Sequence, residues 1–268
     1  MLAIINLLSI ILYFTCGAIL LSKMARLDHL PAINKRHVFA IASISVLIHG
    51  VILYQQLFSP VGFDIRFFHV LSLVAWLVAL LLIISMLNMQ IECLGIIVFP
   101  FAAFMLLLGY LPSEAHLLTY EMKSGILVHI LFSILAYSLL SIAAVQALLL
   151  YIQDSHLHNR HPGGFVRALP ALETMETLLF RIILLGFVTL SIALLSGIFY
   201  LEDMFAQHIA HKTILSLVAW LLFAVLLWGR WQYGWRGRIA IRWTYSGFIV
   251  LMLAYFGSKF VIELVLNR

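Results

Sequence analysis

The sequence has little charge. Of its 268 residues, 10% are Asp, Glu, Lys or Arg, whereas 64% are apolar. An ordinary soluble domain carries about 25% charged residues, and a soluble chain of this size exposes more surface than so few charges could cover. The composition argues against soluble enzymes, nucleic-acid-binding proteins and disordered proteins. It is typical of a polytopic membrane protein.

Cysteine is scarce as well. Cys16 and Cys93 fall in or at the end of different apolar stretches, and no Cys-x-x-Cys spacing occurs. This placement argues against thiol redox chemistry and indicates small buried side chains. The sequence also lacks an internal repeat, a low-complexity tract and a soluble domain.

Long apolar stretches are what the sequence does have. A membrane helix needs roughly 20 mostly apolar residues, and eight stretches satisfy this requirement. They span about residues 2–22, 38–58, 67–86, 93–110, 125–152, 179–201, 213–229 and 243–264. We therefore predict an all-α fold over residues 1–268, a single integral membrane domain with a bundle of eight transmembrane helices. The first stretch lacks a preceding basic segment and a cleavage site, so we expect a retained helix rather than a signal peptide.

The connections carry three further signals. Gln153–Thr177 is the longest polar connection and contains a His-Pro-Gly-Gly break at His161–Gly164. Its last part, Leu169–Thr177, predicts an early start of the sixth helix, with Pro170 near the first turn. Pro100 and Gly95 mark a candidate break in the fourth helix.

The placement of the basic residues predicts the orientation. With the N-terminus outside, eleven basic residues fall on the cytoplasmic side: Lys23, Arg26, Lys35, Arg36, Arg160, Arg167, Arg181, Arg230, Arg236, Arg238 and Arg242. Five fall on the outer side or at outer helix ends: Arg66, Lys123, Lys212, Lys259 and Arg268. Because cytoplasmic loops carry the excess of Lys and Arg, both termini are expected outside. The net charge of +5 then needs no nucleic-acid partner.

His49 stands near the middle of the second predicted helix, in Val46-Leu-Ile-His-Gly50. A neutral imidazole in hydrocarbon must satisfy one donor and one acceptor. Two interpretations are open. The ring either hydrogen bonds to a neighbouring helix, with Gly50 allowing close approach, or is an axial ligand to haem iron.

His129 lies about one turn inside the outer end of the fifth predicted helix. His129, Ser133, Ala136 and Tyr137 share one helix face at i, i+4, i+7 and i+8. A polar stripe with small residues normally faces other helices or a cavity. An interhelical hydrogen bond and a ligand role are both consistent with this pattern.

Other histidines gather near the predicted helix ends. On the outer side these are His69, His116, His208 and His211, and on the cytoplasmic side they are His156, His158 and His161. The i, i+3 spacing of His208 and His211 suits a metal ion if the segment is helical, but no third ligand is evident nearby. We interpret both groups as exposed histidines.

Two basic features remain. Lys212 begins the seventh predicted helix at the outer boundary, where it either meets a carboxylate such as a haem propionate or simply snorkels to the interface. The segment Trp228–Arg238 combines tryptophans, glycines and arginines, as an interfacial anchoring belt does. Arg236 is the candidate within it for a specific grip on a carboxylate or phosphate.

Several of these residues occur in the order seen in one family. His129 with Tyr137, Ser196-Gly197-Ile-Phe-Tyr200, Lys212-Thr213 through Ala219-Trp220, Gly234-Trp-Arg-Gly-Arg-Ile-Ala240 and Ala254-Tyr-Phe-Gly257 follow one another here. The chain thus resembles the cytochrome c assembly protein family, most of all a bacterial inner-membrane branch near the HemX-like proteins. The resemblance is strongest over Gly125–Gly257, and the predicted eight-helix layout extends it to the whole chain.

The resemblance implies haem handling in the bacterial inner membrane, with both termini periplasmic. Members of the family pass haem between two membrane histidines and hold it at an outer tryptophan-rich segment between two further histidines. His49 matches the first membrane histidine by helix and depth, and His129 matches the first outer histidine by its motif. The expected partners are membrane lipid, haem and other cytochrome c assembly proteins.

This chain departs from the family pattern at three places. The segment Glu202–Lys212 contains no tryptophan, Trp228-Gly-Arg230 stands where the second membrane histidine is expected, and no histidine follows the eighth predicted helix. We therefore expect an accessory protein that binds or hands on haem through His129 and then His49, with Tyr137 and Lys212 beside it, and not a complete haem-attachment synthase. The alternatives are a transporter component for a small solute, with the polar stripe lining its path, and a structural partner without a ligand.

Overall fold

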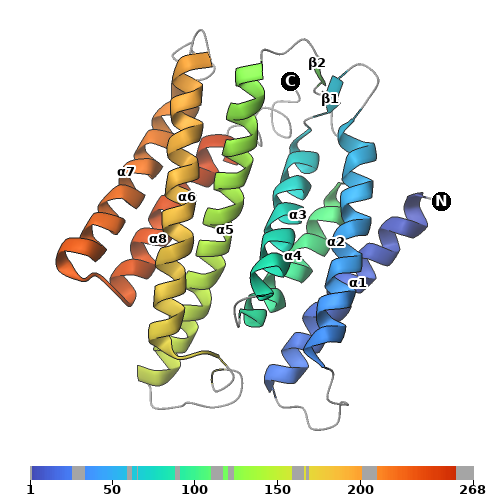
Figure 1. The fold of residues 1–268 in the computed structure, drawn as a ribbon, viewed down its shortest axis with the longest axis horizontal. Coiled ribbons are helices and arrows are strands. Elements are labelled where there is room, and N and C mark those ends of the chain that lie inside the picture. Colours follow the sequence, from blue (N-terminus) through green and yellow to red (C-terminus); the bar gives the residue numbers. More distant parts are fainter. Residues whose placement is uncertain are drawn as a thin grey trace. The chain divides into compact units, whose positions relative to one another are not determined.

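The protein is almost entirely helical wherever its structure is described (Figure 1). The computed structural model describes residues 2–25, 34–58, 62–64, 66–87, 91–109, 117–119, 124–158, 166, 169–200 and 210–257. The helices are α1 (Leu2–Ala25), α2 (Lys35–Leu57), α3 (Phe67–Met86), α4 (Gly95–Leu108), α5 (Ser124–His158), α6 (Leu172–Tyr200), α7 (Ala210–Tyr233) and α8 (Arg238–Met252). A 3₁₀ turn, Glu92–Leu94, precedes α4, and a π-helical turn, Leu253–Gly257, follows α8. The strands β1 (Gly62–Asp64) and β2 (Leu117–Thr119) pair with each other.

Seven of these helices are long and apolar enough to cross a membrane. The fourth apolar segment, Glu92–Leu108, is shorter than the others. The prediction of an all-α polytopic membrane protein is therefore confirmed.

The chain folds into two compact units. Unit 1 comprises Met1–Leu118 with Ile152–Ala171, and unit 2 comprises Thr119–Tyr151 with Leu172–Arg268. The α5 helix contributes to both, since its last residues belong to unit 1. The single integral membrane domain expected from the sequence stays a prediction.

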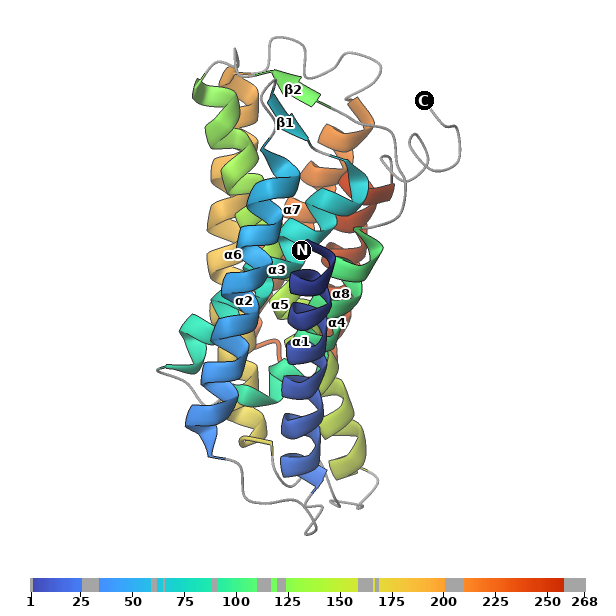
Figure 2. The ribbon, with the colours of Figure 1, turned by 90° about the vertical axis from the view of Figure 1, so that its right-hand side faces the viewer.

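Unit 1 is an antiparallel bundle of α1, α2, α3 and α4. Each helix packs against two others, in the cyclic order α1, α2, α3, α4, and Figure 2 shows the α1 to α4 ribbons running side by side. The chain enters α2 through Asn34, whose side-chain oxygen accepts a hydrogen bond from the Arg36 backbone N–H. This cap satisfies one of the free amide groups at the helix start.

Helix α4 is continuous through Pro100. The proline ring lies against Gly17 of α1, where an added Cβ would come within 2.7 Å of it. Helix α1 thus packs closely against α4 at the position where proline cannot donate a backbone hydrogen bond. The candidate break at Pro100 and Gly95 is therefore absent, and with it the feature that suggested a transporter's broken helix.

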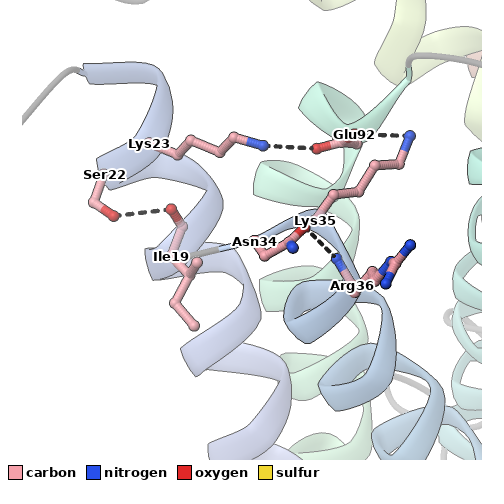
Figure 3. A network of polar contacts seen from close by, with 7 residues as sticks. All are labelled: Ile19, Ser22, Lys23, Asn34, Lys35, Arg36 and Glu92. Carbon is pink, nitrogen blue, oxygen red and sulfur yellow. Dashed lines mark hydrogen bonds and ion pairs between the residues drawn. The ribbon is translucent and has the colours of Figure 1, made fainter. Parts of the chain in front are cut away.

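Three helices of unit 1 meet in a charged cluster at one end. Glu92 pairs with Lys23 at the end of α1 (3.3 Å) and with Lys35 at the start of α2 (2.9 Å), as Figure 3 shows. Partial burial raises the pKa of the Glu92 carboxyl, but the two ammonium groups outweigh this effect and hold the pKa below its ordinary value of 4.5. Arg36 follows Lys35 directly but is drawn pointing away from Glu92.

The pairing of β1 with β2 marks the opposite end of unit 1. β1 lies between α2 and α3, and β2 follows α4. Since α4 begins beside Glu92 and leads to β2, the segment Glu92–Leu108 runs from one end of the bundle to the other despite its shorter length. We refer to these ends as the Glu92 end and the β1 end.

Unit 2 contains most of α5 together with α6, α7 and α8. Polar groups join its helices: Gln146 of α5 donates to the Met175 carbonyl of α6 (3.0 Å) and Trp220 of α7 donates to Ser191 of α6 (2.8 Å). The Leu140 side chain packs over Gly186 of α6, where a Cβ would come within 2.7 Å of it. The three contacts position α6 between α5 and α7.

The connection between α5 and α6 was predicted as a polar loop from Gln153, with an early start of the sixth helix within Leu169–Thr177, and the predicted beginning of the loop was wrong. Helix α5 continues to His158 and α6 begins at Leu172. Gln153 donates to the Pro170 carbonyl (2.8 Å) and so brings the two helix ends together. The early start of α6 is confirmed, while His161–Gly164 and the predicted end of the last helix at Leu264 lie outside the described residues.

The Glu92 cluster yields a stability prediction. Lys35→Met should lower the thermal midpoint in detergent at pH 7, corresponding to about 0.5–1 kcal/mol for partly exposed ion pairs. Because the folded-state pKa of Glu92 is depressed, the contribution of the pairs is present above pH 4.5 and is lost as the pH falls below that value. Arg36→Met, which removes a neighbouring cation, is the control. Equal midpoints for the two variants at pH 7 would contradict the prediction.

Candidate haem-binding site

His129 joins α5 to α6 within unit 2. Its Nδ1 lies 2.7 Å from the Ala193 carbonyl oxygen and 3.4 Å from the Ser196 hydroxyl. A carbonyl oxygen only accepts, so Nδ1 carries the proton and donates it. The other nitrogen, Nε2, then bears a free lone pair, and none of the residues that the structure describes donates a hydrogen bond to it. The side chain is half-buried.

Tyr137, two turns further along the same face of α5, is held in place. Its hydroxyl donates to the Leu251 carbonyl of α8 (2.8 Å). Its ring meets the Phe256 ring edge-on at 5.7 Å and lies 6.1 Å from the Tyr255 ring. Tyr137 therefore fixes α5 against the end of α8 and the π-helical turn.

Lys212 approaches the same turn from α7. Its ammonium nitrogen lies 5.8 Å from the centre of the Tyr255 ring, a distance at which the ring face attracts a cation. The structure thus brings Tyr137, Tyr255 and Lys212 into one contact series in the unit that also holds His129. Three elements separated in sequence meet at the Ala254-Tyr-Phe-Gly257 segment.

His49 has a different environment in unit 1. Its Nδ1 lies 3.2 Å from the Tyr13 hydroxyl of α1 and its Nε2 lies 3.0 Å from the Ser72 hydroxyl of α3. All three side chains are fully buried. Both ring nitrogens are engaged, which is the geometry of the interhelical-packing interpretation. His49 and His129 belong to different units.

The remaining histidines that the structure describes do not form a metal site. The expectation that His69 is exposed was wrong. Its side chain is buried, with Nδ1 3.8 Å from the Asp64 carboxylate, which also pairs with Arg66 at 2.7 Å. His156 donates to the Ile152 carbonyl one turn earlier, and His211 is exposed. The described residues contain no group of three or more potential metal ligands. His116, His161 and His208 lie outside the described residues.

The turn between α7 and α8 is tighter than an anchoring belt requires. The Trp235 ring lies so close over Gly229 that a Cβ at this position would clash with it, and the Arg230 guanidinium donates to the Trp235 carbonyl (3.1 Å). Gly234 and Gly237 have φ of +66° and +56°, a region that glycine adopts most readily. These requirements account for the Gly-Trp-Arg-Gly motif without Arg236.

A buried carboxylate closes this turn. Glu176 of α6 accepts a hydrogen bond from the Gly237 backbone N–H at 2.7 Å. Arg230 also lies over the Phe180 ring of α6 at 4.7 Å, whereas Arg236 is exposed and no described residue pairs with it.

Three residues with structural roles were not predicted from the sequence: Glu176, Tyr13 and Ser72. Glu176 stands near the start of the apolar run of α6, and this position was the one sign of a special role. Its partner is a backbone N–H, which cannot be identified from the sequence. Tyr13 and Ser72 are residue types that occur commonly in membrane helices, so nothing in the sequence marked them as partners of His49.

The turn yields a second prediction. Arg230→Lys should lower the thermal midpoint by the equivalent of about 1 kcal/mol or more, because a point charge replaces a planar group that both donates and stacks. Arg236→Lys should leave it unchanged. The measurement is thermal unfolding of the purified variants, and equal losses for both would show that charge alone matters at this turn.

Comparisons with known proteins give the relationships of the chain. The family model described as cytochrome C assembly protein matches residues 37–266. The inner membrane protein YpjD of Escherichia coli strain K12 is 39% identical over 170 residues, 63% of this chain and 64% of that protein, so the match covers somewhat less than two thirds of the relative's length. The cytochrome c biogenesis protein CcsA of Prochlorococcus marinus strain MIT 9301 is 25% identical over 85% of this chain and 84% of its own length. No solved structure matches.

The family match covers the chain from α2 onward and so includes parts of both units, while α1 lies outside it. It contains His49 and His129, and it contains the motifs around Tyr137, Lys212 and Gly234. With the helical architecture and the seven long apolar helices, the chain is a multi-pass membrane protein that belongs to the cytochrome c assembly protein family.

Proposed function

We propose that this protein binds haem in unit 2 and handles it during cytochrome c biogenesis as an accessory protein of the inner membrane. His129 is the proposed axial ligand to the iron. Haem itself and other cytochrome c assembly proteins are the proposed partners. The observation that carries the proposal is the hydrogen bond from His129 Nδ1 to the Ala193 carbonyl.

That hydrogen bond is the support that metal-binding histidines usually have. A ligating imidazole donates its second N–H to a carbonyl or carboxylate, which fixes the tautomer and raises the basicity of the free nitrogen. Here the carbonyl belongs to another helix, and Ser196 donates to it as well (2.8 Å). Imidazole is the most frequent protein ligand of haem iron, so the donor chemistry at His129 fits the group.

Two other residues of unit 2 suit a haem ring with propionates. The Lys212 ammonium group provides a cation for a carboxylate, and it lies beside the Tyr255 ring. Tyr137 supplies an aromatic wall that its bond to Leu251 keeps rigid. Haem would contribute iron chemistry when bound, whereas the side chains bind and orient it.

His49 is the second proposed ligand, at greater energetic cost. Its Nε2 would have to exchange the Ser72 hydroxyl for iron, and a buried hydroxyl left without a partner costs about 1–3 kcal/mol. A role for His49 therefore requires a rearrangement in unit 1. His129 needs no such change.

The composition of the Glu202–Lys212 segment supports an accessory role. It has no tryptophan, whereas the resemblance implies a tryptophan-rich platform for haem attachment at this place. We therefore assign binding or transfer of haem to this chain, and bond formation with apocytochrome to other proteins.

The proposed topology has eight crossings with both termini outside. The segment Glu92–Leu108 joins the two ends of unit 1, which supports counting it as a crossing although it is shorter than the seven other helices. The excess of basic residues then lies on the cytoplasmic side. The cluster around Glu92 would face the cytoplasm and β1 would face outward.

Haem binding is tested by titration of the purified protein. The wild type should show a b-type visible spectrum on adding haem, and His129→Ala should weaken binding at least about tenfold because the axial ligand is lost. His156→Ala is a matched control, since His156 lies on the same helix and its Nδ1 also donates to a carbonyl, but within its own helix.

Two outcomes of the titration count against the proposal. A protein that stays colourless would refute haem binding and favour the transport alternative, which solute flux in proteoliposomes then tests. Unchanged binding by His129→Ala, with loss in His49→Ala, would move the site to unit 1.

The topology is tested with a reporter that is active only in the cytoplasm. Fusions after Arg36, Arg167 or Arg238 should be active, and fusions after Arg66, Met122 or His208 should be silent. A reversed pattern would refute the orientation. If the fusion after Met122 is active while that after Arg66 is silent, the segment Glu92–Leu108 does not cross.

A further inference from the structure

The turn between α7 and α8 carries a series of aromatic rings. Trp228 meets Tyr233 edge-on at 5.7 Å, and Tyr233 stacks on Trp235 at 6.4 Å. Trp235 in turn lies 5.5 Å from Trp243 of α8. Trp231 is 82% exposed, Tyr233 64% and Trp228 54%. We call Trp228, Trp231, Tyr233, Trp235 and Trp243 the aromatic surface. So much exposed ring area in one place marks an interaction surface.

The aromatic surface lies where two membrane-crossing helices end. The apolar span of α7 ends at Tyr233 and that of α8 begins at Arg238, so only residues 234–237 separate them. Figure 1 shows α8 returning beside α7, against which it packs. Tryptophan and tyrosine favour the boundary between hydrocarbon and water, because each ring has an apolar body and one polar atom. We therefore expect the aromatic surface to lie among lipid headgroups.

Two arginines at this turn have no partner in the described protein. Arg236 lies in the turn and Arg242 lies one turn into α8, and both are exposed. Neither side chain forms an ion pair or a hydrogen bond with a residue that the structure describes. Arg230, by contrast, donates to the Trp235 carbonyl and lies over the Phe180 ring. The fold uses Arg230 but leaves two guanidinium groups for a ligand outside the chain.

The described part of unit 2 has few carboxylates that could neutralise these arginines. The segment Ala210–Gly257 contains no Asp or Glu. On α6, Glu176 accepts from the Gly237 backbone N–H, and Glu173 is exposed at the helix start. Neither carboxylate pairs with Arg236 or Arg242. The turn thus carries positive charge without a partner of opposite sign.

The fold brings the two arginines to the edge of the aromatic surface. The contact between Trp235 and Trp243 holds the turn against α8. Arg236 follows Trp235 directly and Arg242 precedes Trp243 directly, and neighbouring Cα atoms are about 3.8 Å apart. The hydrogen bond from Gly237 to Glu176 fixes the turn against α6 as well. Rings and guanidinium groups are therefore presented together by a well-supported turn.

This combination of groups selects the chemistry of the ligand. A guanidinium group matches two phosphate oxygens at once, and exposed rings pack against glycerol and the upper part of an acyl chain. A phospholipid has both parts, whereas a soluble phosphate has only the first. A headgroup with its own cation neutralises its phosphate, so two arginines without carboxylates favour a lipid with net negative charge.

We propose that the α7–α8 turn is a binding site for an anionic phospholipid. Arg236 and Arg242 hold its phosphate, and the aromatic surface receives its glycerol and upper acyl chain. The site gives a role to Arg236, the residue of the Gly-Trp-Arg-Gly motif that the fold itself does not use. It is independent of haem at His129.

Lipid selectivity is measured by quenching of tryptophan fluorescence. Four of the six tryptophans belong to the aromatic surface, so the fluorescence mainly reports lipid contact there. The full-length protein is placed in phosphatidylcholine vesicles that contain either brominated phosphatidylglycerol or brominated phosphatidylcholine. Phosphatidylglycerol should bind at least about fivefold more tightly, because basic residues near the headgroups attract anionic lipid. Equal quenching by the two lipids would overturn the proposal.

The arginines are tested with two double variants that remove equal charge. Arg236→Gln with Arg242→Gln should reduce the preference for phosphatidylglycerol at least about fivefold. Its thermal midpoint in detergent should match the wild type, since neither side chain pairs within the described protein. Arg36→Gln with Arg181→Gln, which removes two exposed arginines elsewhere, should keep the preference. Equal losses in the two double variants would assign the preference to net charge and refute the site.

The aromatic surface is tested by native mass spectrometry of the protein with phosphatidylglycerol in detergent. Trp231→Ala should weaken lipid binding at least about threefold, because a large ring is removed from the contact. Phe199→Ala is the matched control: its ring is 77% exposed, at the opposite end of α6. Equal effects of the two substitutions would show that the lipid does not bind at the turn.

The source of the phosphate is tested in the same measurement by adding inorganic phosphate or glycerol 3-phosphate. Neither should displace phosphatidylglycerol at millimolar concentration, because both lack the acyl chain that packs on the rings. Displacement by either compound would assign the two arginines to a soluble phosphate and overturn the lipid site.

Discussion

A protein surrounded by lipid must satisfy its buried polar groups internally, since hydrocarbon offers no hydrogen bonds. Most of the specific contacts in this chain obey that constraint. Gln146 bonds to a carbonyl of α6, Tyr137 bonds to a carbonyl of α8, and Glu176 accepts from the Gly237 backbone. Apolar length decides which segments enter the membrane, but these few polar groups decide which helix faces which.

The constraint also explains why His49 and His129 use their ring nitrogens differently. His49 meets two hydroxyl groups, each of which can donate or accept, so both of its nitrogens are used. His129 meets a carbonyl, which only accepts, so its proton is fixed on Nδ1 and its lone pair is left on Nε2. The partner atom, more than the depth of the residue in the membrane, decides whether an imidazole nitrogen keeps a free lone pair.

The sequence was sufficient to predict the helices, because a run of about 20 apolar residues has few alternatives in a membrane protein. It was less informative where α5 extends beyond its apolar run. The polar residues 153–158 were assigned to a loop, yet they are helical, and Gln153 bonds to the Pro170 carbonyl. His129, His49, Tyr137 and Lys212 stood out as polar residues in apolar surroundings. Their partners did not, since a backbone carbonyl such as that of Ala193 or Leu251 is the same in every sequence.

The contact between Glu176 and Gly237 joins two residues 61 positions apart. During synthesis the carboxylate of α6 emerges well before the amide that satisfies it. Until then Glu176 must remain among lipid headgroups or water, because an unpaired carboxylate is costly in hydrocarbon. This hydrogen bond can therefore form only after α7 has followed α6 and Gly237 has reached the carboxylate. The closing of this turn is therefore a late step in the assembly of unit 2, after all three helices have been synthesised.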